Sequence, residues 1–443
     1  METVVDGFTH GGEGVARIDG KAVFVAGALP GERVRVRVTA ERKRWARADL
    51  LDVLEPAPER VTPPCPYAAA CGGCDLQHVS VAGQLHLKTR VVREQLERIG
   101  RLTEPPVRDC VPVGPALGYR TQARMHADAD GHLGFHRHGT NDVVPVDRCI
   151  VLTPAAQSIR DVVGDNSGSV EATLHATSTG DRAAILTTDA PPVPVGADTM
   201  LGVRSPDHRA HTPPDWVQGS GVVGEHVAGF DFDVTAGGFF QGNIPGAEAL
   251  VAAVLDAVAT LAPDDAAQDA AAPAADDADP GASDDAPTDR TAPTERAPLV
   301  LDLYAGVGLF TLPLAATGAR VTAVEVVADA VAHLADNAAR AGQADRIVPV
   351  TADVAAFVDR SDLPDPDVVV VDPPRTGCGI EVMTALAATA RSMIVYVACD
   401  PAALARDARV LVEAGWTLLQ VRPFDLFPMT HHVEAVATFT RHD

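Results

Sequence analysis

A cysteine close to the C-terminal end of the chain stands where a nucleophile could act. Cys399 follows the apolar run 393–397 and precedes Asp400 and Pro401. A thiol at the end of a buried strand lies at the edge of a sheet, where its thiolate can attack a bound substrate. A single cysteine is more often a small buried apolar residue, so its neighbours have to decide between the two interpretations.

A carboxylate further along the chain could serve as the matching base. Carbon C5 of a pyrimidine becomes nucleophilic only after a thiolate adds to C6, so its methylation needs one cysteine and one base for the C5 proton. A ring nitrogen needs no such cysteine, because its lone pair is already nucleophilic. Glu434 precedes the last expected strand and is our candidate base, and His431 and His432 compete for this role or for substrate contact. A strand-edge carboxylate without a chemical role is the alternative for Glu434.

A glycine loop upstream predicts a site for the methyl donor. The buried-strand pattern 299–304 runs into a loop with Gly306 and Gly308, and a second strand, 321–325, ends in Glu325. Glycines let the backbone approach a ligand closely, and the carboxylate suits the two hydroxyls of a ribose. The loop lacks the third glycine of a phosphate-cradling motif. The pattern therefore favours an S-adenosylmethionine-dependent methyltransferase over a nicotinamide-binding Rossmann domain.

Two further runs flank this expected donor site. Asp372 ends the fourth strand, and the two prolines after it lock a turn that points the aspartate at the reaction centre. Arg375 takes the position at which amino-methyltransferases carry an aromatic residue that stacks on the target base, so a different target atom is indicated. The adjacent phenylalanines of the run 239–241 could stack on an extruded base, with two core side chains as the alternative. Gln241 could contact the amino-acid end of the donor.

Four cysteines in the first third of the chain predict a metal site. They are Cys65, Cys71, Cys74 and Cys149. Four thiolates can hold a [4Fe–4S] cluster or a structural Zn²⁺, and the spacing differs from the two Cys-x2-Cys knuckles of a zinc ribbon. We therefore favour the iron–sulfur cluster, in a structural role that shapes an RNA-binding surface. Cys110 and Cys378 have no assigned role.

The charge of the chain is strongly negative but unevenly spread. The net charge of −24 over 443 residues argues against a generic nucleic-acid-binding surface. Seven of the fifteen residues 33–47 are basic, whereas the stretch 262–298 is rich in alanine and aspartate, and we expect it to be a disordered insertion. The sequence shows neither a signal peptide nor a long apolar run, which predicts a cytoplasmic protein without a membrane span.

The pattern of elements predicts a chain in three parts. Residues 1–55 read as short strands, with valines and arginines alternating over 33–38, and fit a small barrel of the OB type. A solvated edge strand is the alternative for that alternation. Residues 56–235 hold the cysteines and form a β-rich central domain, and 236–443 alternate strands and helices as in a doubly wound parallel sheet. Helices are expected at 83–99 and at about 246–261.

Together these motifs resemble the bacterial RNA uracil-C5-methyltransferases, the group that includes the iron–sulfur 23S ribosomal RNA m5U methyltransferases. The resemblance spans nearly the whole chain. It rests on the barrel, the four cysteines and the runs 118–120, 239–241, 301–308, 372–375, 399–401 and 432–434. It implies an α/β fold: an N-terminal OB-like TRAM barrel, a central iron–sulfur domain and a C-terminal Rossmann-like class I methyltransferase domain. It also implies that part of the helical segment 78–113 packs on the catalytic domain.

The resemblance assigns roles to individual residues. It implies Cys399 as the nucleophile and Glu434 as the proton acceptor. The family's contacts to S-adenosylmethionine carry over to Gln241, Tyr304, Glu325 and Asp372. Two departures stand out: the family usually has Ser-Cys-Asn-Pro around the nucleophile, where this chain has Ala-Cys-Asp-Pro over 398–401, and commonly has a cysteine in place of Ala305. The change from Asn to Asp can alter base contacts or local charge.

The leading hypothesis is S-adenosylmethionine-dependent methylation of uracil C5 in RNA through a covalent adduct between Cys399 and C6. Analogy favours 23S ribosomal RNA over transfer RNA as the partner. The alternatives are uracil-C5 methylation of transfer RNA, cytosine-C5 methylation of RNA, and a non-catalytic RNA-binding protein that keeps the methyltransferase fold. We expect a monomer.

Overall fold

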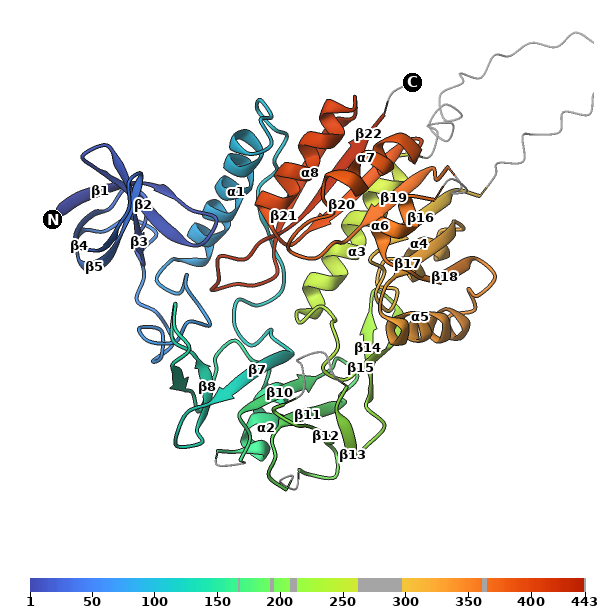
Figure 1. Cartoon of the computed structure of the whole chain (residues 1–443), viewed down its shortest axis with the longest axis horizontal. Coiled ribbons are helices and arrows are strands. Elements are labelled where there is room, and N and C mark those ends of the chain that lie inside the picture. The colour runs from blue at the N-terminus through green and yellow to red at the C-terminus, as the bar shows by residue number, and fades with distance from the viewer. Residues whose placement is uncertain (166–167, 192–194, 208–212, 262–296, 361–364, 442–443) are drawn as a thin grey trace, which may run out of the picture.

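The computed structural model describes residues 1–165, 168–191, 195–207, 213–261, 297–360 and 365–441. Figure 1 shows the N-terminal barrel at one end, the C-terminal sheet with its helices at the other, and the strands of the central part below them. The stretch 262–298, expected to be a disordered insertion, lies outside the described residues except for its last two. Among the described residues, we find no helix long and apolar enough to cross a bilayer.

The N-terminal strands close into a small barrel in the order β1-β2-β3-β5-β4. Their bounds are β1 (Glu2–Phe8), β2 (Glu13–Ile18), β3 (Lys21–Ala26), β4 (Arg33–Glu41) and β5 (Trp45–Glu55). Val34 and Val36 of β4 are buried in the barrel, while Arg33, Arg35 and Arg37 point outward. The alternation predicted a half-buried strand, and this is confirmed. Because β4 pairs with both β1 and β5, it is not the solvated edge strand of the alternative.

The outward arginines of β4 are neutralised on the barrel itself. Each lies within ion-pair distance of a carboxylate on a neighbouring strand: Arg33 of Glu2 and Glu55, Arg35 of Glu2 and Asp52, and Arg37 of Asp49. Part of the positive charge of the segment 33–47 is therefore paired with carboxylates of the barrel. The negative net charge of the chain is in keeping with this.

The central part of the chain is built on a mixed sheet. Its strands follow the order β13-β12-β11-β10-β7-β8-β9. Their bounds are β7 (Gln122–Ala127), β8 (Leu133–His136), β9 (Val143–Pro145), β10 (Glu171–Ala176), β11 (Arg182–Thr187), β12 (Met200–Arg204) and β13 (Asp215–Gln218). Helix α2 (Pro154–Val163), which the sequence had not led us to expect, buries Ala156, Ile159 and Val163 in the core of this sheet. A hairpin, β14 (Val222–Val227) and β15 (Phe230–Thr235), leads toward the C-terminal part.

The C-terminal part is a second sheet in the order β18-β17-β16-β19-β20-β22-β21-β6. Its strands are β16 (Leu299–Leu303), β17 (Arg320–Glu325), β18 (Ile347–Thr351), β19 (Val368–Val371), β20 (Met393–Ala398), β21 (Thr417–Asp425), β22 (Glu434–Thr440) and β6 (Val111–Pro112). Strands β16 to β20 run parallel, but β22 is antiparallel to both β20 and β21. The predicted doubly wound sheet is therefore parallel over β16 to β20, and β22 adds an antiparallel strand at this side. The short connection 426–433 turns the chain directly back, and no crossover helix intervenes there.

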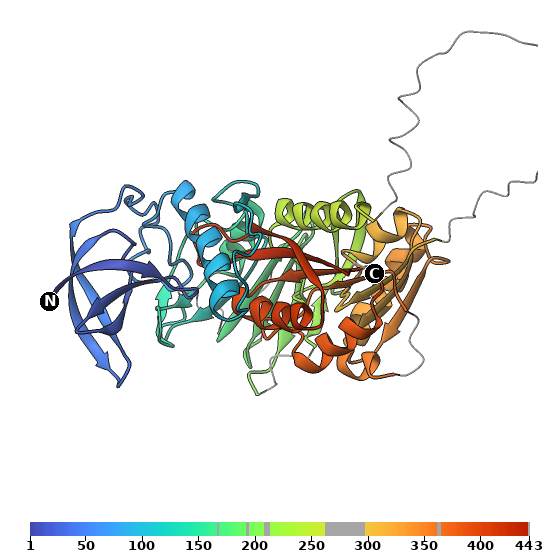
Figure 2. The ribbon, with the colours of Figure 1, turned by 90° about the horizontal axis from the view of Figure 1, so that it is seen from above.

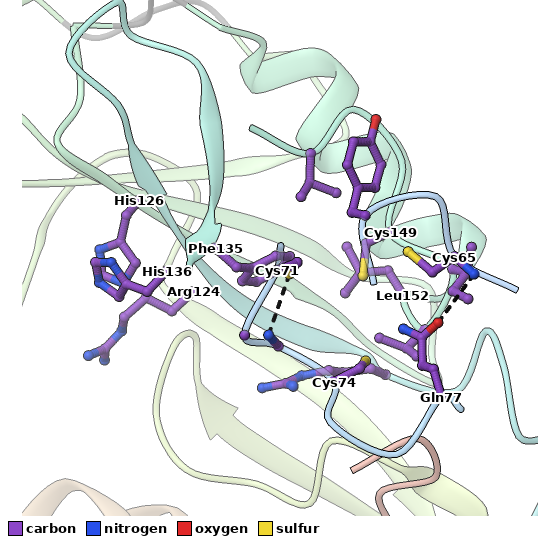
Figure 3. A pocket seen from close by; sticks show the side chains of 17 residues that line it. Cys65, Cys71, Cys74, Gln77, Arg124, His126, Phe135, His136, Cys149 and Leu152 are labelled. Atoms are coloured by element: carbon purple, nitrogen blue, oxygen red, sulfur yellow. Dashed lines mark hydrogen bonds between the residues drawn. The ribbon is translucent and has the colours of Figure 1, made fainter. Parts of the chain in front are cut away.

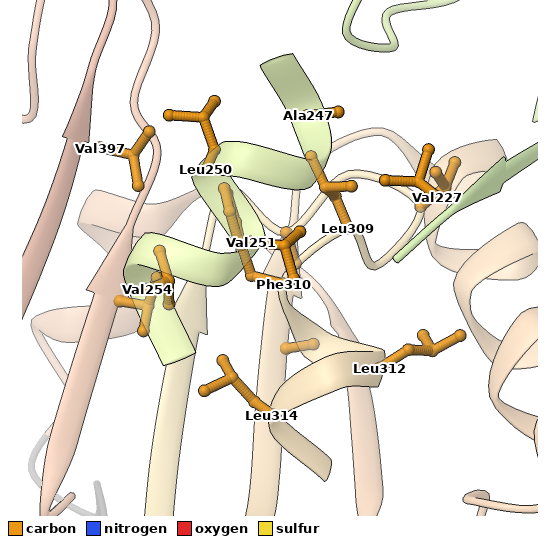
Figure 4. Packing of buried hydrophobic residues seen from close by; sticks show 14 of the residues in the cluster. Val227, Ala247, Leu250, Val251, Val254, Leu309, Phe310, Leu312, Leu314 and Val397 are labelled. Atoms are coloured by element: carbon orange, nitrogen blue, oxygen red, sulfur yellow. The ribbon is translucent and has the colours of Figure 1, made fainter. Parts of the chain in front are cut away.

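Helices cover both faces of the C-terminal sheet. One face carries α3 (Ile244–Ala259), α4 (Thr311–Ala316) and α5 (Ala328–Arg340). The other carries α1 (Val81–Arg98), α6 (Val354–Val358), α7 (Ile380–Thr389) and α8 (Pro401–Glu413). Successive residues of the buried strands alternate between the two cores, as a pleated strand requires. On the first face, Figure 4 shows Val251 of α3 reaching toward Phe310, while Leu250 lies on the side of Val397.

Helix α1 joins the C-terminal sheet although it precedes the central part in sequence. Figures 1 and 2 both place it between the barrel and α8. The buried Lys88 of α1 pairs with the buried Asp425 at the end of β21, and it also donates a hydrogen bond of 3.1 Å to the carbonyl oxygen of Phe427. Strand β6 pairs with β21. The segment from α1 to β6 therefore packs on the C-terminal sheet.

Candidate active site

Cys399 stands between a buried strand and the start of a helix. Every residue of β20 is buried, and α8 begins two residues after the cysteine. The Asp400 side chain caps the helix, because its Oδ1 accepts a hydrogen bond of 2.7 Å from the backbone N–H of Ala403, and Pro401 occupies the first helical turn. Burial raises the pKa of the Cys399 thiol to about 12, with further contributions from Glu434 and Asp372. The thiol is therefore protonated before substrate binds.

Glu434 is brought to the same edge by the antiparallel pairing of β22 with β20. It is the first residue of β22, and its neighbour Ala435 pairs with Ala398, the residue before Cys399. Its side chain is buried, with 5% of the residue exposed. Burial, followed by the charge of Asp372, raises the pKa of the Glu434 carboxyl to about 8, against an opposing effect of Arg375. A carboxyl with such a pKa exchanges its proton near neutral pH.

A small cavity of about 60 Å³ lies next to Cys399. One lining residue comes from the N-terminal barrel and one, Arg375, from the turn after β19. The others come from the segments around Cys399 and just before Glu434, together called the catalytic edge below. The lining residues are His10, Arg375, Cys399, Asp400, Pro401, His431, His432 and Val433. Arg375 is exposed, and its Nη2 lies 3.4 Å from Nε2 of His432. Burial, followed by the nearby charges of His431 and Arg375, lowers the pKa of His432 to about 3, so His432 is neutral near pH 7. Of the two histidines proposed to compete with Glu434, His432 is thus a very weak base.

The expected donor site is formed at the carboxyl ends of β16 and β17. Tyr304 adopts a positive φ of 64°, a conformation that L-residues avoid and that is found at functional sites. A Cβ atom built on Gly306 would meet no atom within 4 Å, which leaves the loop open to a ligand. The Glu325 carboxylate accepts hydrogen bonds from the backbone N–H groups of Gly306 (3.1 Å) and Val327 (2.8 Å), which fix its orientation at the end of β17.

Two carboxyl groups with unusual proton affinity lie between the donor loop and the catalytic edge. Burial raises the pKa of Asp372, at the end of β19, to about 7, and Asp302 of the adjacent strand β16 adds to this. Burial, opposed by a hydrogen bond from Thr311, raises the pKa of Asp302 to about 7. Asp302 begins the Asp-x-x-x-Gly-x-Gly pattern within the run 301–308, but sequence reasoning gave it no role of its own. A carboxylate inside the otherwise apolar strand run 299–303 is the signal that could have revealed it.

The run 239–241 divides between surface and interior. Phe239 is 81% exposed, whereas Phe240 is 7% exposed and packs in the core beneath α3. The alternative of a core side chain is therefore correct for Phe240, and only Phe239 is exposed as stacking on a base would require. Gln241 is buried just before α3, whose N-cap residue Asn243 donates a hydrogen bond of 2.7 Å to the carbonyl oxygen of Leu426. This bond ties the start of α3 to the connection before β22.

The structure brings the four predicted ligand cysteines into one cavity of about 290 Å³. Figure 3 shows Cys65, Cys71, Cys74 and Cys149 around this cavity. All seven cysteines of the chain fall within the described residues, and all are free thiols. The backbone N–H groups of Cys65 and Cys149 donate to side-chain oxygens, at 3.2 Å to Gln77 and at 3.1 Å to Gln157. Two pieces of chain that are distant in sequence thus present thiols to a common space.

Comparisons with known proteins agree with this geometry. Residues 2–51 match the TRAM domain family, and residues 290–409 match the TRM5/TYW2 methyltransferase domain family. The solved structure of the tRNA (uracil-54, C5)-methyltransferase of Pyrococcus abyssi covers 99% of this chain and 100% of its own, with a TM-score of 0.72 at 22% identity. The fold is therefore that of a class I S-adenosylmethionine-dependent methyltransferase that carries an N-terminal TRAM barrel, as predicted.

Relatives identify the family within this class. A protein of Streptomyces avermitilis named "Uncharacterized RNA methyltransferase" is 34% identical over 98% of this chain and 97% of its own length. The 23S rRNA (uracil(1939)-C(5))-methyltransferase RlmD of Chromohalobacter salexigens is 36% identical over 99% of this chain and 88% of its own length. The chain belongs to the RNA uracil-C5-methyltransferase family. The predicted resemblance is confirmed.

Proposed function

We propose that this protein methylates carbon C5 of uracil in RNA, with S-adenosylmethionine as the methyl donor. One observation carries the proposal: the end of β20 lies beside the start of β22, and the two strands bring a thiol, Cys399, and a buried carboxyl, Glu434, to one edge of the sheet. Methylation of a nucleobase nitrogen would need neither group, whereas methylation of C5 needs both.

The chemistry assigned to the chain begins with Cys399. Its thiol gives a proton to solvent, and the sulfur bonds to C6 of the uracil while the electron pair of the C5–C6 double bond moves toward C5 and the C4 carbonyl. Bound S-adenosylmethionine supplies the methyl group that C5 then takes up. The carboxylate of Glu434 removes the proton from C5, and the returning electron pair restores the double bond and expels the sulfur. Atoms and charges balance without a redox partner.

The proton affinities support this division of roles. A base works best when its pKa lies near the operating pH, and burial places the pKa of Glu434 at about 8. Cys399 has a pKa of about 12 in the free protein, so its proton has to leave in the complex with substrate. Arg375 opposes both upward shifts. We assign it the role of favouring the anionic forms of the two groups.

The residues proposed to hold the methyl donor surround the donor loop. Glu325 is assigned to the ribose hydroxyls, Gln241 to the amino-acid end, and Tyr304 and Asp372 to further contacts. The open space above Gly306 and the fixed carboxylate of Glu325 support this arrangement. Asp372, at the end of β19, is close enough to Cys399 and Glu434 for its charge to raise the pKa of both groups.

A [4Fe–4S] cluster is proposed for the cysteine cavity, held by Cys65, Cys71, Cys74 and Cys149. Among the residues that the structure describes, the thiols do not form a group whose ligand atoms all lie within 4.8 Å of one another. Tetrahedral zinc with bonds of ~2.3 Å would draw four sulfurs to within about 4 Å. The wider spacing and the all-thiol donor set fit the larger cluster. Its assigned role is structural, and no step of the reaction passes through it.

The remaining assignments concern organisation and partners. We propose a TRAM barrel over 1–55, a central iron–sulfur and RNA-binding domain over 56–235, whose helical segment 78–113 packs on the catalytic domain, and a methyltransferase domain over 236–443, in a monomeric cytoplasmic protein. The printed name of the Chromohalobacter salexigens relative favours 23S ribosomal RNA as substrate. The Pyrococcus abyssi structure, at lower identity, keeps transfer RNA as the second candidate.

The function is tested by trapping the covalent complex. A short RNA with 5-fluorouridine at the target position should form a stable adduct with the protein and S-adenosylmethionine, because Glu434 cannot remove fluorine from C5. Mass spectrometry should place the bond on Cys399. An RNA with cytidine at that position should remain unmethylated. Methylation of cytidine, or binding of the fluorinated RNA without any adduct, would contradict the proposal.

A further inference from the structure

The barrel reaches into the candidate active site through the turn between β1 and β2. His10, at this turn, places its Nε2 2.8 Å from Oδ2 of Asp400, the residue that follows Cys399. His10 also lines the cavity beside Cys399. The two partners are 390 positions apart in sequence, and the contact joins two different parts of the molecule.

Asp400 is held at both of its carboxylate oxygens. Oδ1 accepts the backbone N–H of Ala403 at 2.7 Å, and Oδ2 meets His10. Since a carboxylate is only an acceptor, His10 has to donate through Nε2–H. Burial would raise the pKa of Asp400, but the hydrogen bonds from His10 and Ala403 and the charge of His10 bring it below its usual value. The carboxylate is thus ionised and anchored on two sides.

The family's asparagine would make this contact differently. An asparagine offers one oxygen and one amino group, so its oxygen could cap α8 while its amino group met His10 as an acceptor. With Asp400 the direction of the hydrogen bond to the barrel is reversed. The Asn-to-Asp change therefore keeps a contact with the barrel possible but exchanges donor and acceptor, and each oxygen of Asp400 has a protein partner.

The turn that carries His10 packs closely against the connection before β22 and against the loop that contains Asp75. Gly12 has a φ of +82°, and a Cβ atom there would lie 3.0 Å from Cβ of His431 and 3.2 Å from Oδ2 of Asp75. The rings of His10 and His431 meet edge to face with their centroids 6.5 Å apart. The backbone N–H of Glu13 donates to the Thr9 hydroxyl at 2.9 Å, which closes the turn. Because the turn is held in one conformation, the position of the barrel can fix the position of Asp400 and, through it, of Cys399.

We propose that His10 is a positioning residue for Cys399: by holding Asp400, the TRAM barrel completes the active site in addition to any contact it makes with RNA. This inference rests on the proposed function, because the measured step is the attack of Cys399 on C6. Misplacement of a reacting group by about 1 Å can cost on the order of 100-fold in rate. Loss of the contact should therefore slow the attack without a matching loss of RNA affinity.

The test compares the rate of adduct formation with 5-fluorouridine RNA, under single-turnover conditions, with the Kd for the same RNA. His10→Ala should lower the rate by about 10-fold or more and change the Kd by less than about threefold. His10→Gln, whose amide can donate to Asp400, should recover most of the rate. Asp400→Ala should be at least as slow as His10→Ala, since it also removes the cap of α8, and the double variant should be no slower than Asp400→Ala, because His10 then has no contact left to lose.

A surface pair supplies the matched control. His226 Nδ1 lies 2.6 Å from Oδ1 of Asp231 on the hairpin β14–β15, and both side chains are exposed. His226→Ala should leave both quantities unchanged. If the wild-type protein forms no adduct, the proposed function fails and this inference with it. If the wild-type protein forms the adduct and His10→Ala either reacts at the normal rate or loses RNA affinity alone, only the positioning role is overturned.

Discussion

Asp75, the residue after Cys74, accepts hydrogen bonds from both the backbone N–H and the ring of His431, three residues before Glu434. The backbone N–H groups of Asp75 and Leu76 also donate to the carbonyl oxygen of Met429, at 3.1 and 2.9 Å. The loop that carries Cys74 is thus hydrogen-bonded to the connection 426–433, which precedes Glu434. We therefore expect the cysteine loop and this connection to keep a fixed position relative to each other, as one unit.

Replacement of Asp75 should weaken this unit. Asp75→Ala leaves the N–H and the ring of His431 without their acceptor, and the loss of hydrogen bonds to a charged group costs about 1.5–3 kcal/mol each before relaxation. We expect a lower free energy of unfolding, measured by urea denaturation, and slower methylation in single-turnover assays. Asp109→Ala, at an exposed aspartate, is the control. Wild-type stability together with wild-type turnover in Asp75→Ala would contradict the coupling.

Much of the fold could be predicted because local patterns carried it. The valine–arginine alternation of β4 needed only the period of two along a strand, and the glycine loop before α4 needed only the geometry of a strand-to-helix turn. The expectation that Cys399 and Glu434 lie at the same site followed from chemistry, because methylation of C5 needs a nucleophile and a base together. These features depend on neighbours in sequence or on a known reaction.

Other features could not be predicted because they depend on contacts between distant segments. Neither His10 nor Asp75 stands in a local pattern that names Asp400 or His431 as its partner. The exposure of Phe239 and the burial of Phe240 are decided by the core beneath α3 rather than by their adjacent positions. A residue's partner in another domain is set by how the domains pack, and one sequence does not contain that information in readable form.

Removal of the proposed nucleophile should separate binding from chemistry. Cys399→Ala takes away only the sulfur, and Cys399 lies beyond the strand ends that carry the donor loop. We expect no methylation and no adduct with 5-fluorouridine RNA, while S-adenosylmethionine binds with wild-type affinity by calorimetry. Cys110→Ala, at a buried cysteine that lines neither the cavity beside Cys399 nor the cysteine cavity, is the matched control. Retained turnover in Cys399→Ala would assign the attack to another group.

Removal of the proposed base should arrest the reaction at a later point. Glu434→Gln keeps the shape of the side chain but cannot take up the C5 proton, so the sulfur cannot leave. With ordinary uridine RNA we expect one methyl group per protein and a cross-link between protein and RNA that survives denaturing electrophoresis. Release of free methylated RNA at the normal rate would show that another group removes the proton.

The buried acids should make stability depend on pH. Folding raises the pKa of Asp302 from 3.8 to about 7 and that of Glu434 from 4.5 to about 8, mainly through burial. The folded state therefore keeps protons that the unfolded chain has lost, and its free energy of unfolding should fall as pH rises from about 4 to about 8. Asp302→Asn should flatten this slope, being more stable than wild type at pH 8 and nearly equal to it at pH 4.

Urea denaturation across this pH range measures the effect. Glu248→Gln, at an exposed glutamate of α3, should keep the wild-type slope. A wild-type protein whose stability rises between pH 4 and pH 8, with Asp302→Asn following the same curve, would show that these acids are ionised in the folded state.

The cluster assignment makes a prediction about composition. Protein purified without oxygen should be brown and should contain about four irons per chain. Cys149→Ser should lose most of this iron, because Cys149 is the proposed ligand that comes from outside the segment 65–74. Cys110→Ala, at a buried cysteine that does not line the cavity, should retain it. A content of one zinc and no iron per chain would contradict the cluster assignment. The four thiols would then hold a single metal ion and would have to lie closer together.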